Sequence, residues 1–172
     1  MFARITDAGR MIKFSHSVFA LPFALIGVFL ASHSLGQKFP PFVLFILWLI
    51  CMVAARASAM AFNRISDYGL DCINPRTSNR ELPTGKLSLR FARWFLAGCI
   101  TIFILAAAMF LAVYKNPWPL VFAPFVLIFI CLYSYSKRFT NLSHFWLGAS
   151  LGLAPVASWV AVSPPSGKIR AP

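Results

Sequence analysis

Residues 41–63 of this chain read PFVLFILWLICMVAARASAMAFN, an apolar run that contains a single charged residue, Arg56. A helix needs roughly 20 predominantly apolar residues to cross the hydrocarbon core of a bilayer. In lipid, every backbone polar group must find its partner within the helix itself, so a run of this kind forms a helix. The stretch therefore predicts a transmembrane helix.

Four more runs of the same character flank this one, at 14–34, 91–113, 118–136 and 143–163. Together they predict an all-α fold, a multi-span transmembrane bundle with about five spans in a single domain over 1–172. The composition agrees, with 59% hydrophobic residues and a mean hydropathy of +0.75, whereas soluble proteins average roughly 45–50% apolar residues. A soluble globular domain is excluded, and the lipid bilayer is the expected partner.

The basic residues predict the orientation of the spans. Of the 16 Lys and Arg, eleven lie in alternate segments that include the N-terminus and the 63–93 loop, and four lie in the segments between them. Such residues favour the cytoplasmic side. We therefore expect a multi-pass protein of the inner (cytoplasmic) membrane, with its N-terminus and 63–93 loop cytoplasmic. A net charge of +12 also suits nucleic acid, but the basic residues form short segments beside apolar runs, so no nucleic-acid partner is expected.

Arg56 is the sixteenth basic residue and lies within the second apolar run. A charge at the bilayer centre costs about 2.5–3.5 kcal/mol or more, and such a residue is a candidate for function. The alternative is that Arg56 extends its side chain to the membrane surface. Asn63 marks the end of the run seven residues away, about 10 Å along a helix, so that extension is possible but strained.

Three of the four acidic residues follow the second run closely, namely Asp67, Asp71 and Glu81. Asn63, Asp67 and Asp71 are four residues apart, so on a continuous helix they share one face with Arg56. Two carboxylates about 6 Å apart repel by about 3 kcal/mol at an effective dielectric constant of 20. Either a Mg²⁺ ion, bound together with substrate phosphates, or pairing with neighbouring arginines offsets this repulsion.

The same stretch resembles a known motif. The spaced residues Asn63, Asp67 and Asp71, with NPRT at 74–77, Arg80 and LPTG at 82–85, resemble the first aspartate-rich motif of the UbiA family of intramembrane aromatic prenyltransferases. The likeness is to its 4-hydroxybenzoate polyprenyltransferase branch and the menaquinone-pathway relatives. Two further stretches fit the family, KFSHSVFALPF at 13–23 and the pattern Tyr133-x-x-x-Lys137-Arg138.

The resemblance implies Mg²⁺-dependent transfer of a polyprenyl group from polyprenyl diphosphate to an aromatic acid, 4-hydroxybenzoate or a naphthoate, in ubiquinone or menaquinone biosynthesis. It implies that Asn63, Asp67 and Asp71 bind Mg²⁺ and that Asp67, Asp71 and Lys137 are catalytic. The residues expected to contact the substrates are Asn63, Arg56, Arg64, Arg76, Arg80, Tyr133 and Arg138. Among these, Arg56 would hold the carboxylate of the acceptor, and Tyr133 fits an interfacial aromatic residue equally well.

One departure from the family pattern concerns the acids. The family carries a second aspartate-rich motif in a bundle of about nine helices, whereas no Asp or Glu follows Glu81 here. We therefore expect the chain to be the N-terminal portion of the enzyme, truncated on its C-terminal side and inactive alone. The alternative function is a membrane transporter or ion-binding protein that uses Arg56 with the pair Asp67 and Asp71.

Overall fold

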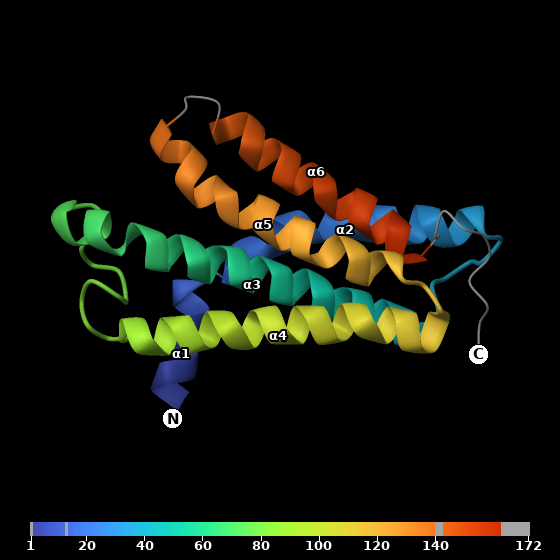
Figure 1. Ribbon diagram of the computed structural model, residues 1–172, viewed down its shortest axis with the longest axis horizontal. Helices are drawn as coiled ribbons and strands as arrows, with labels where there is room; N and C mark the ends of the chain where they lie inside the picture. Colours follow the sequence, from blue (N-terminus) through green and yellow to red (C-terminus); the bar gives the residue numbers. More distant parts are fainter. Residues whose placement is uncertain (1, 13, 140–142, 163–172) are drawn as a thin grey trace.

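The chain forms a bundle of long helices. The computed structural model describes residues 2–12, 14–139 and 143–162, and the side chains of 6–12, 21–136, 139 and 144–162. Within the described ranges there are six helices and no strand, so the all-α prediction is confirmed. In chain order the helices are α1 (Phe2–Met11), α2 (Phe14–Ser34), α3 (Phe42–Ile73), α4 (Leu89–Tyr114), α5 (Trp118–Phe139) and α6 (Ser143–Val162). Helices α2 to α6 run lengthwise along the molecule (Figure 1), and α1 is short.

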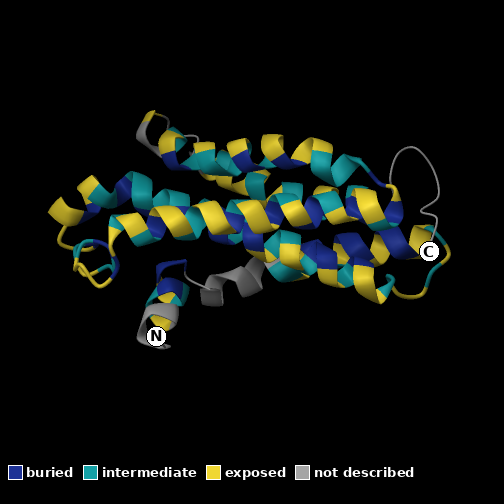
Figure 2. Cartoon of the chain, turned by 60° about the horizontal axis from the view of Figure 1, so that its bottom comes forward, coloured by how far each residue is buried: buried dark blue, intermediate teal, exposed yellow. Residues whose placement is uncertain are grey.

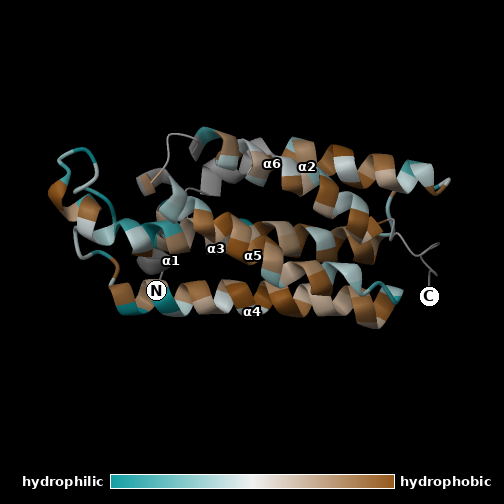
Figure 3. Ribbon diagram, turned by 45° about the horizontal axis from the view of Figure 1, so that its top comes forward, coloured by the Kyte–Doolittle hydropathy of each residue, from teal (hydrophilic) through white to brown (hydrophobic). Residues whose placement is uncertain are grey.

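Four of these helices are long and apolar enough to cross a membrane: α3, α4, and the segments Trp118–Ser136 of α5 and His144–Val162 of α6. The fifth expected span, 14–34, coincides with α2, whose described side chains cover only Leu21–Ser34. Large apolar side chains face outward along the helices, and Leu105 and Ile128 are 60% and 58% exposed. Exposed residues recur along each helix (Figure 2), and hydrophobic residues dominate the helices (Figure 3). The chain is therefore a multi-pass membrane protein.

Helix α3 is longer than the apolar run that predicted it. It continues without a break past Gly69 to Ile73 and contains 32 residues, which corresponds to about 48 Å at 1.5 Å per residue. The hydrocarbon core is only about 30 Å thick. The last turns of α3, which carry Asn63, Asp67 and Asp71, therefore extend the transmembrane helix toward the membrane surface.

The helices pack in two main pairs, α3 against α4 and α2 against α6, with α5 contacting α3, α4 and α6. The α2–α6 pair approaches closely at Gly27, where an added Cβ atom would lie 2.7 Å from the carbonyl oxygen of Pro155. Only a glycine permits this backbone separation. The arrangement leaves a space bounded mainly by α3, α5 and α6.

The connection between α3 and α4, residues 74–88, folds over the end of the bundle as a series of turns. Backbone N–H groups of Thr77, Arg80 and Thr84 donate to carbonyl oxygens three or four residues earlier. Leu82 and Leu87 are buried with Met11 of α1 against α3 and α4. The connection is thus anchored by its two leucines, and it presents Arg80 to the end of α3.

Candidate active site

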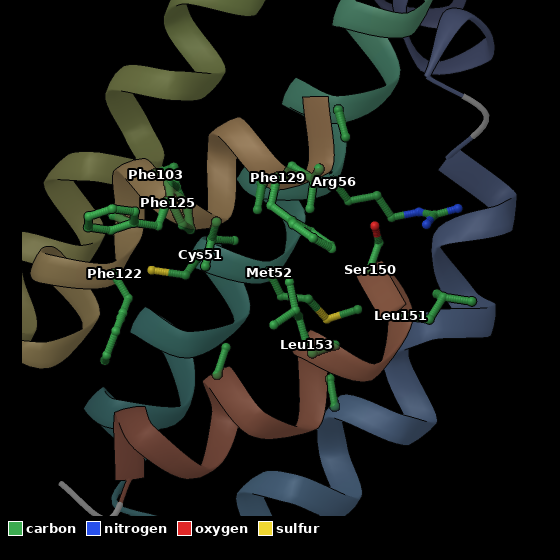
Figure 4. Close-up of a pocket in the computed structure, with 18 of the residues that line it drawn as sticks. Cys51, Met52, Arg56, Phe103, Phe122, Phe125, Phe129, Ser150, Leu151 and Leu153 are labelled. Carbon is green, nitrogen blue, oxygen red and sulfur yellow. The ribbon is translucent and has the colours of Figure 1, made fainter. Parts of the chain in front are cut away.

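A cavity of about 800 Å³ lies among α3, α4, α5 and α6, and Ala24 of α2 also lines it. Along α3 its lining runs from Trp48 to Asp67, a separation of about 28 Å on a helix. Most of the wall is apolar and aromatic, as Figure 4 shows. The largest of these side chains are Trp48, Trp118, Phe103, Phe110, Phe122, Phe125 and Phe129.

Charged residues line only part of the cavity, toward the end that the 74–88 connection covers. The charged residues and the amide there are Arg56, Asn63, Arg64, Asp67 and Arg80, all of which the sequence singled out. The hydroxyl-bearing residues Tyr133, Ser150 and Ser158 also line the cavity, and Ser158 accepts a hydrogen bond from Nε1 of Trp48. Arg56 projects from α3 into the cavity on the side where Ser150 and Leu151 of α6 line it (Figure 4). Asp67 is buried, with 6% of its surface exposed. The cavity therefore combines a long apolar wall with one charged end.

Asp71 does not line this cavity, although it lies one turn beyond Asp67 on α3. Its buried carboxylate accepts hydrogen bonds from Nη1 of Arg80, which lies 2.7 Å from each carboxylate oxygen. The hydroxyl of Thr77 donates to the backbone oxygen of Asp71 at 3.3 Å. Pairing of an acid with a neighbouring arginine was one of the two arrangements left open by the sequence, and it is the arrangement of Asp71 here.

Arg64 is buried and links the cavity to the N-terminal helix. Its Nε donates to the carbonyl oxygen of Met11, the last residue of α1, at 3.1 Å. A guanidinium at a helix C-terminus stabilises the carbonyl groups that have no partner within the helix. Arg64 therefore supports α1 as well as lining the cavity.

A contact between α3 and α5 was not foreseen from the sequence. Nδ2 of Asn63 donates to Oγ of Ser134 at 3.2 Å, and Ser134 is almost completely buried. The neighbouring pair Phe62 and Tyr135 makes an edge-to-face ring contact at 5.8 Å between centroids. Residues 71 positions apart cannot be paired from one sequence, and the only sequence signal was the proximity of Ser134 to Tyr133, which lines the cavity.

Arg76, a further residue that the sequence singled out, does not line the cavity. Arg76 is exposed, and its backbone N–H donates to Oδ1 of Asn74 at 3.0 Å in a local turn. Lys137 and Arg138 lie near the end of α5. Their side chains fall outside the described residues.

A Mg²⁺ site at this end is compatible with the donor atoms present. In the described part of the chain, no three His, Cys, Asp or Glu side chains gather as a metal-binding group. Mg²⁺ does not require one, because it is usually bound through one or two carboxylates together with waters and substrate phosphates. Asp67 and Asn63, whose side chains carry a carboxylate and an amide, both line the cavity. Asp71 would join them only after release from Arg80.

The known proteins to which this chain is similar are prenyltransferases, in agreement with its motifs. The model of the UbiA prenyltransferase family matches residues 20–168. A 4-hydroxybenzoate octaprenyltransferase of Shewanella frigidimarina is 28% identical over 72% of this chain and 46% of its own length. A protoheme IX farnesyltransferase of Flavobacterium psychrophilum is 31% identical over 94% of this chain and 50% of its own length. The chain therefore spans about half the length of the curated relatives it matches.

Solved structures show the same likeness. The apo structure of a UbiA homolog from Aeropyrum pernix K1 superposes with a TM-score of 0.74 at 34% identity, covering 86% of this chain and 50% of that one. A structure of digeranylgeranylglyceryl phosphate synthase gives a TM-score of 0.79 at 22% identity, covering 94% of this chain and 54% of that one. The second likeness concerns the fold alone.

Proposed function

Because the chain belongs to the UbiA prenyltransferase family, as the resemblance of its motifs had indicated, we propose that it serves in Mg²⁺-dependent transfer of a polyprenyl group from polyprenyl diphosphate to an aromatic acceptor. Quinone biosynthesis is the proposed setting. The family assignment rests on the match over residues 20–168. The activity, the substrates and the metal are the proposal.

The observation that supports this function most strongly is the division of the cavity into an apolar part and a charged end. A polyprenyl diphosphate has the same division, with a long hydrocarbon tail and a strongly anionic head. The apolar wall, which includes Trp48, Phe103 and Phe129, suits the tail, since apolar surface gains about 25 cal/mol per Å² on leaving water. The charged end suits the head group.

The charged end can stabilise a departing diphosphate. Arg64 and Arg80 line it, and guanidinium groups bind phosphate oxygens with paired, charge-assisted hydrogen bonds. Asp67 and Asn63 would hold Mg²⁺, and the bound ion would neutralise charge that develops on the leaving group. Fixed charges of this kind, placed where negative charge develops, lower the barrier to cleavage of the carbon–oxygen bond.

The acceptor is proposed to be an aromatic acid, such as 4-hydroxybenzoate or a naphthoate, because Arg56 lines the cavity deeper than Asn63. The two lie seven residues apart on α3, or about 10 Å along the helix, so Arg56 can hold a carboxylate separate from the diphosphate. The apolar wall would exclude water from the reacting carbon, which favours attack by the ring over hydrolysis.

Binding of farnesyl diphosphate to the purified chain in detergent, with and without Mg²⁺, tests the proposal. We expect binding that Mg²⁺ strengthens, and a loss of at least about tenfold in Asp67→Asn, by analogy with the loss on disturbing a metal site. Binding that depends neither on Mg²⁺ nor on Asp67 would contradict the proposal. Electrogenic ion flux in liposomes without such binding would favour the transporter alternative.

A further inference from the structure

Ser134 of α5 is a buried hydroxyl that contacts the candidate metal site without lining the cavity. It has 1% of its surface exposed, and its Oγ accepts a hydrogen bond of 3.2 Å from Nδ2 of Asn63. Asn63 lines the cavity, whereas Ser134 does not. The bond therefore holds the nitrogen end of the amide on the side of α5.

The orientation of this amide matters because its two ends differ chemically. The carbonyl oxygen of an asparagine accepts hydrogen bonds and can ligate a hard cation, whereas its NH₂ group only donates. The amide is planar, so attaching the nitrogen to Ser134 turns the oxygen to the opposite side. Asn63 and Asp67 both line the cavity, whereas Ser134 does not.

The contact is held in register by its neighbours. Phe62 and Tyr135 lie next to Asn63 and Ser134 in the two sequences, and their rings meet edge to face at 5.8 Å. Helices α3 and α5 run in the same direction (Figure 1), and two neighbouring contacts between them fix both the rotation and the axial position of α5 against α3. Ser134 therefore meets Asn63 at a defined height on α3.

We propose that Ser134 is a positioning residue for the metal site, which directs the amide oxygen of Asn63 toward the cavity and so sets the Mg²⁺ concentration needed to bind a prenyl diphosphate. This inference rests on the proposed function. Ser134 touches neither metal nor substrate. Partners that orient a metal ligand commonly change metal affinity or activity by about 10–100-fold when removed.

The test measures the Mg²⁺ concentration that gives half-maximal binding of farnesyl diphosphate to the purified full chain. We expect Ser134→Ala to raise it about tenfold and Ser134→Thr, which keeps the hydroxyl, to leave it within about twofold of the original chain. The control is Ser58→Ala. Ser58 is also fully buried and donates to its own helix at Ala54, but does not line the cavity. Its removal should not change the Mg²⁺ requirement.

A second set of variants, made in the Asn63→Asp chain, separates an effect on amide orientation from an effect on packing. A carboxylate presents an oxygen at either end, so Asn63→Asp no longer depends on which end faces α5. In the Asn63→Asp background, Ser134→Ala should therefore cause no further rise in the Mg²⁺ requirement. If Ser134→Ala fails to fold, judged by thermal unfolding, the isosteric pair Ser134→Thr and Ser134→Val provides the same comparison.

The outcomes distinguish this inference from the proposed function. An equal rise in both backgrounds, or a rise no larger than that of Ser58→Ala, would overturn the role of Ser134 while leaving Mg²⁺-dependent binding intact. Absence of Mg²⁺-dependent binding in the unaltered chain would overturn the proposed function, and the role of Ser134 with it.

Discussion

Arg80 clamps Asp71 with one nitrogen, since its Nη1 lies 2.7 Å from both carboxylate oxygens. The two residues come from different elements, because Asp71 is in the last turns of α3 and Arg80 is in the connection to α4. The pair therefore fastens the connection to the end of α3. It also occupies a carboxylate that the family resemblance assigns to Mg²⁺.

The clamp should contribute to stability. Arg80→Ala leaves the buried carboxylate of Asp71 without its hydrogen-bond donor, and losing a hydrogen bond to a charged group costs about 1.5–3 kcal/mol. Thermal unfolding in detergent, followed by circular dichroism, should show a lower midpoint. Arg76→Ala is the control, because Arg76 is exposed and such surface changes usually stay within about 0.5 kcal/mol. Equal midpoints for the two variants would contradict a structural role for the clamp.

The same substitution should have opposite effects on two ligands. Arg80→Ala releases the Asp71 carboxylate, so binding of Mg²⁺ alone should become tighter. Binding of farnesyl diphosphate should become weaker by about tenfold or more, because one charge-assisted contact is worth about 1.5–3 kcal/mol. Isothermal titration calorimetry measures both ligands on the same preparation. If Arg80→Ala lowers the affinity for Mg²⁺ as well as that for farnesyl diphosphate, Asp71 does not bind the metal even after its release from Arg80.

A separate prediction concerns Arg56. If it holds the carboxylate of the acceptor, Arg56→Ala should weaken binding of 4-hydroxybenzoate by about 10–100-fold, the equivalent of one hydrogen bond to a charged group. Binding of farnesyl diphosphate should change little, because Arg56 lies about 10 Å from Asn63 along α3. The control ligand is 4-hydroxybenzamide, which lacks the charge and should lose much less affinity. Equal losses for all three ligands would exclude this assignment.

Hydropathy predicted the helices well, because a membrane leaves the backbone few alternatives. The runs at 91–113 and 118–136 correspond to α4 and α5 with small differences at their ends. One such difference has a local cause, since Oγ of Ser88 accepts from the N–H of Phe91 and so starts α4 before the apolar run begins. The second run did not show that α3 continues to Ile73, because its last turns are polar. Helix α1 was not predicted at all.

From the sequence, the candidate site could be predicted only for residues of a single helix, α3. Spacing along α3 placed Arg56, Asn63 and Asp67 on a common face, and all three line the cavity. It could not place Ser134, which meets Asn63 through the packing of α5 on α3. Nor could it choose between metal and arginine as the partner of Asp71, because that depends on how the 74–88 connection folds. The metal, the acceptor and the roles of Lys137 and Arg138 stay predictions.

The orientation in the membrane can be tested with a native cysteine. Cys72 is exposed near the end of α3, whereas Cys51, Cys99 and Cys131 are half-buried or buried. If the 63–93 loop is cytoplasmic, a membrane-impermeant maleimide should label Cys72 in inverted vesicles and not in intact spheroplasts. The control is Lys38→Cys in a Cys72→Ser background. Residue 38 is exposed in the connection at the opposite end of the bundle (Figure 1), so its labelling should be reversed. Labelling of Cys72 in intact spheroplasts would refute the orientation.

The close approach of α2 and α6 gives the sharpest prediction on stability. A Cβ atom at Gly27 would lie 2.7 Å from the carbonyl oxygen and 2.9 Å from the Cα atom of Pro155. Both are backbone atoms, so Gly27→Ala forces the two helices apart instead of displacing a flexible side chain. Overpacking of this kind typically costs about 1–3 kcal/mol.

Gly98→Ala is the matched control, because Gly98 is also helical and an added Cβ there meets nothing within 4 Å. At an open helical position alanine is favoured over glycine by about 1 kcal/mol, so Gly98→Ala should leave the unfolding midpoint unchanged or raise it. Gly27→Ala should lower the midpoint under the same conditions. Since α6 forms one wall of the cavity, Gly27→Ala should also weaken binding of farnesyl diphosphate. If both variants unfold at the same temperature, α2 and α6 do not pack at this distance.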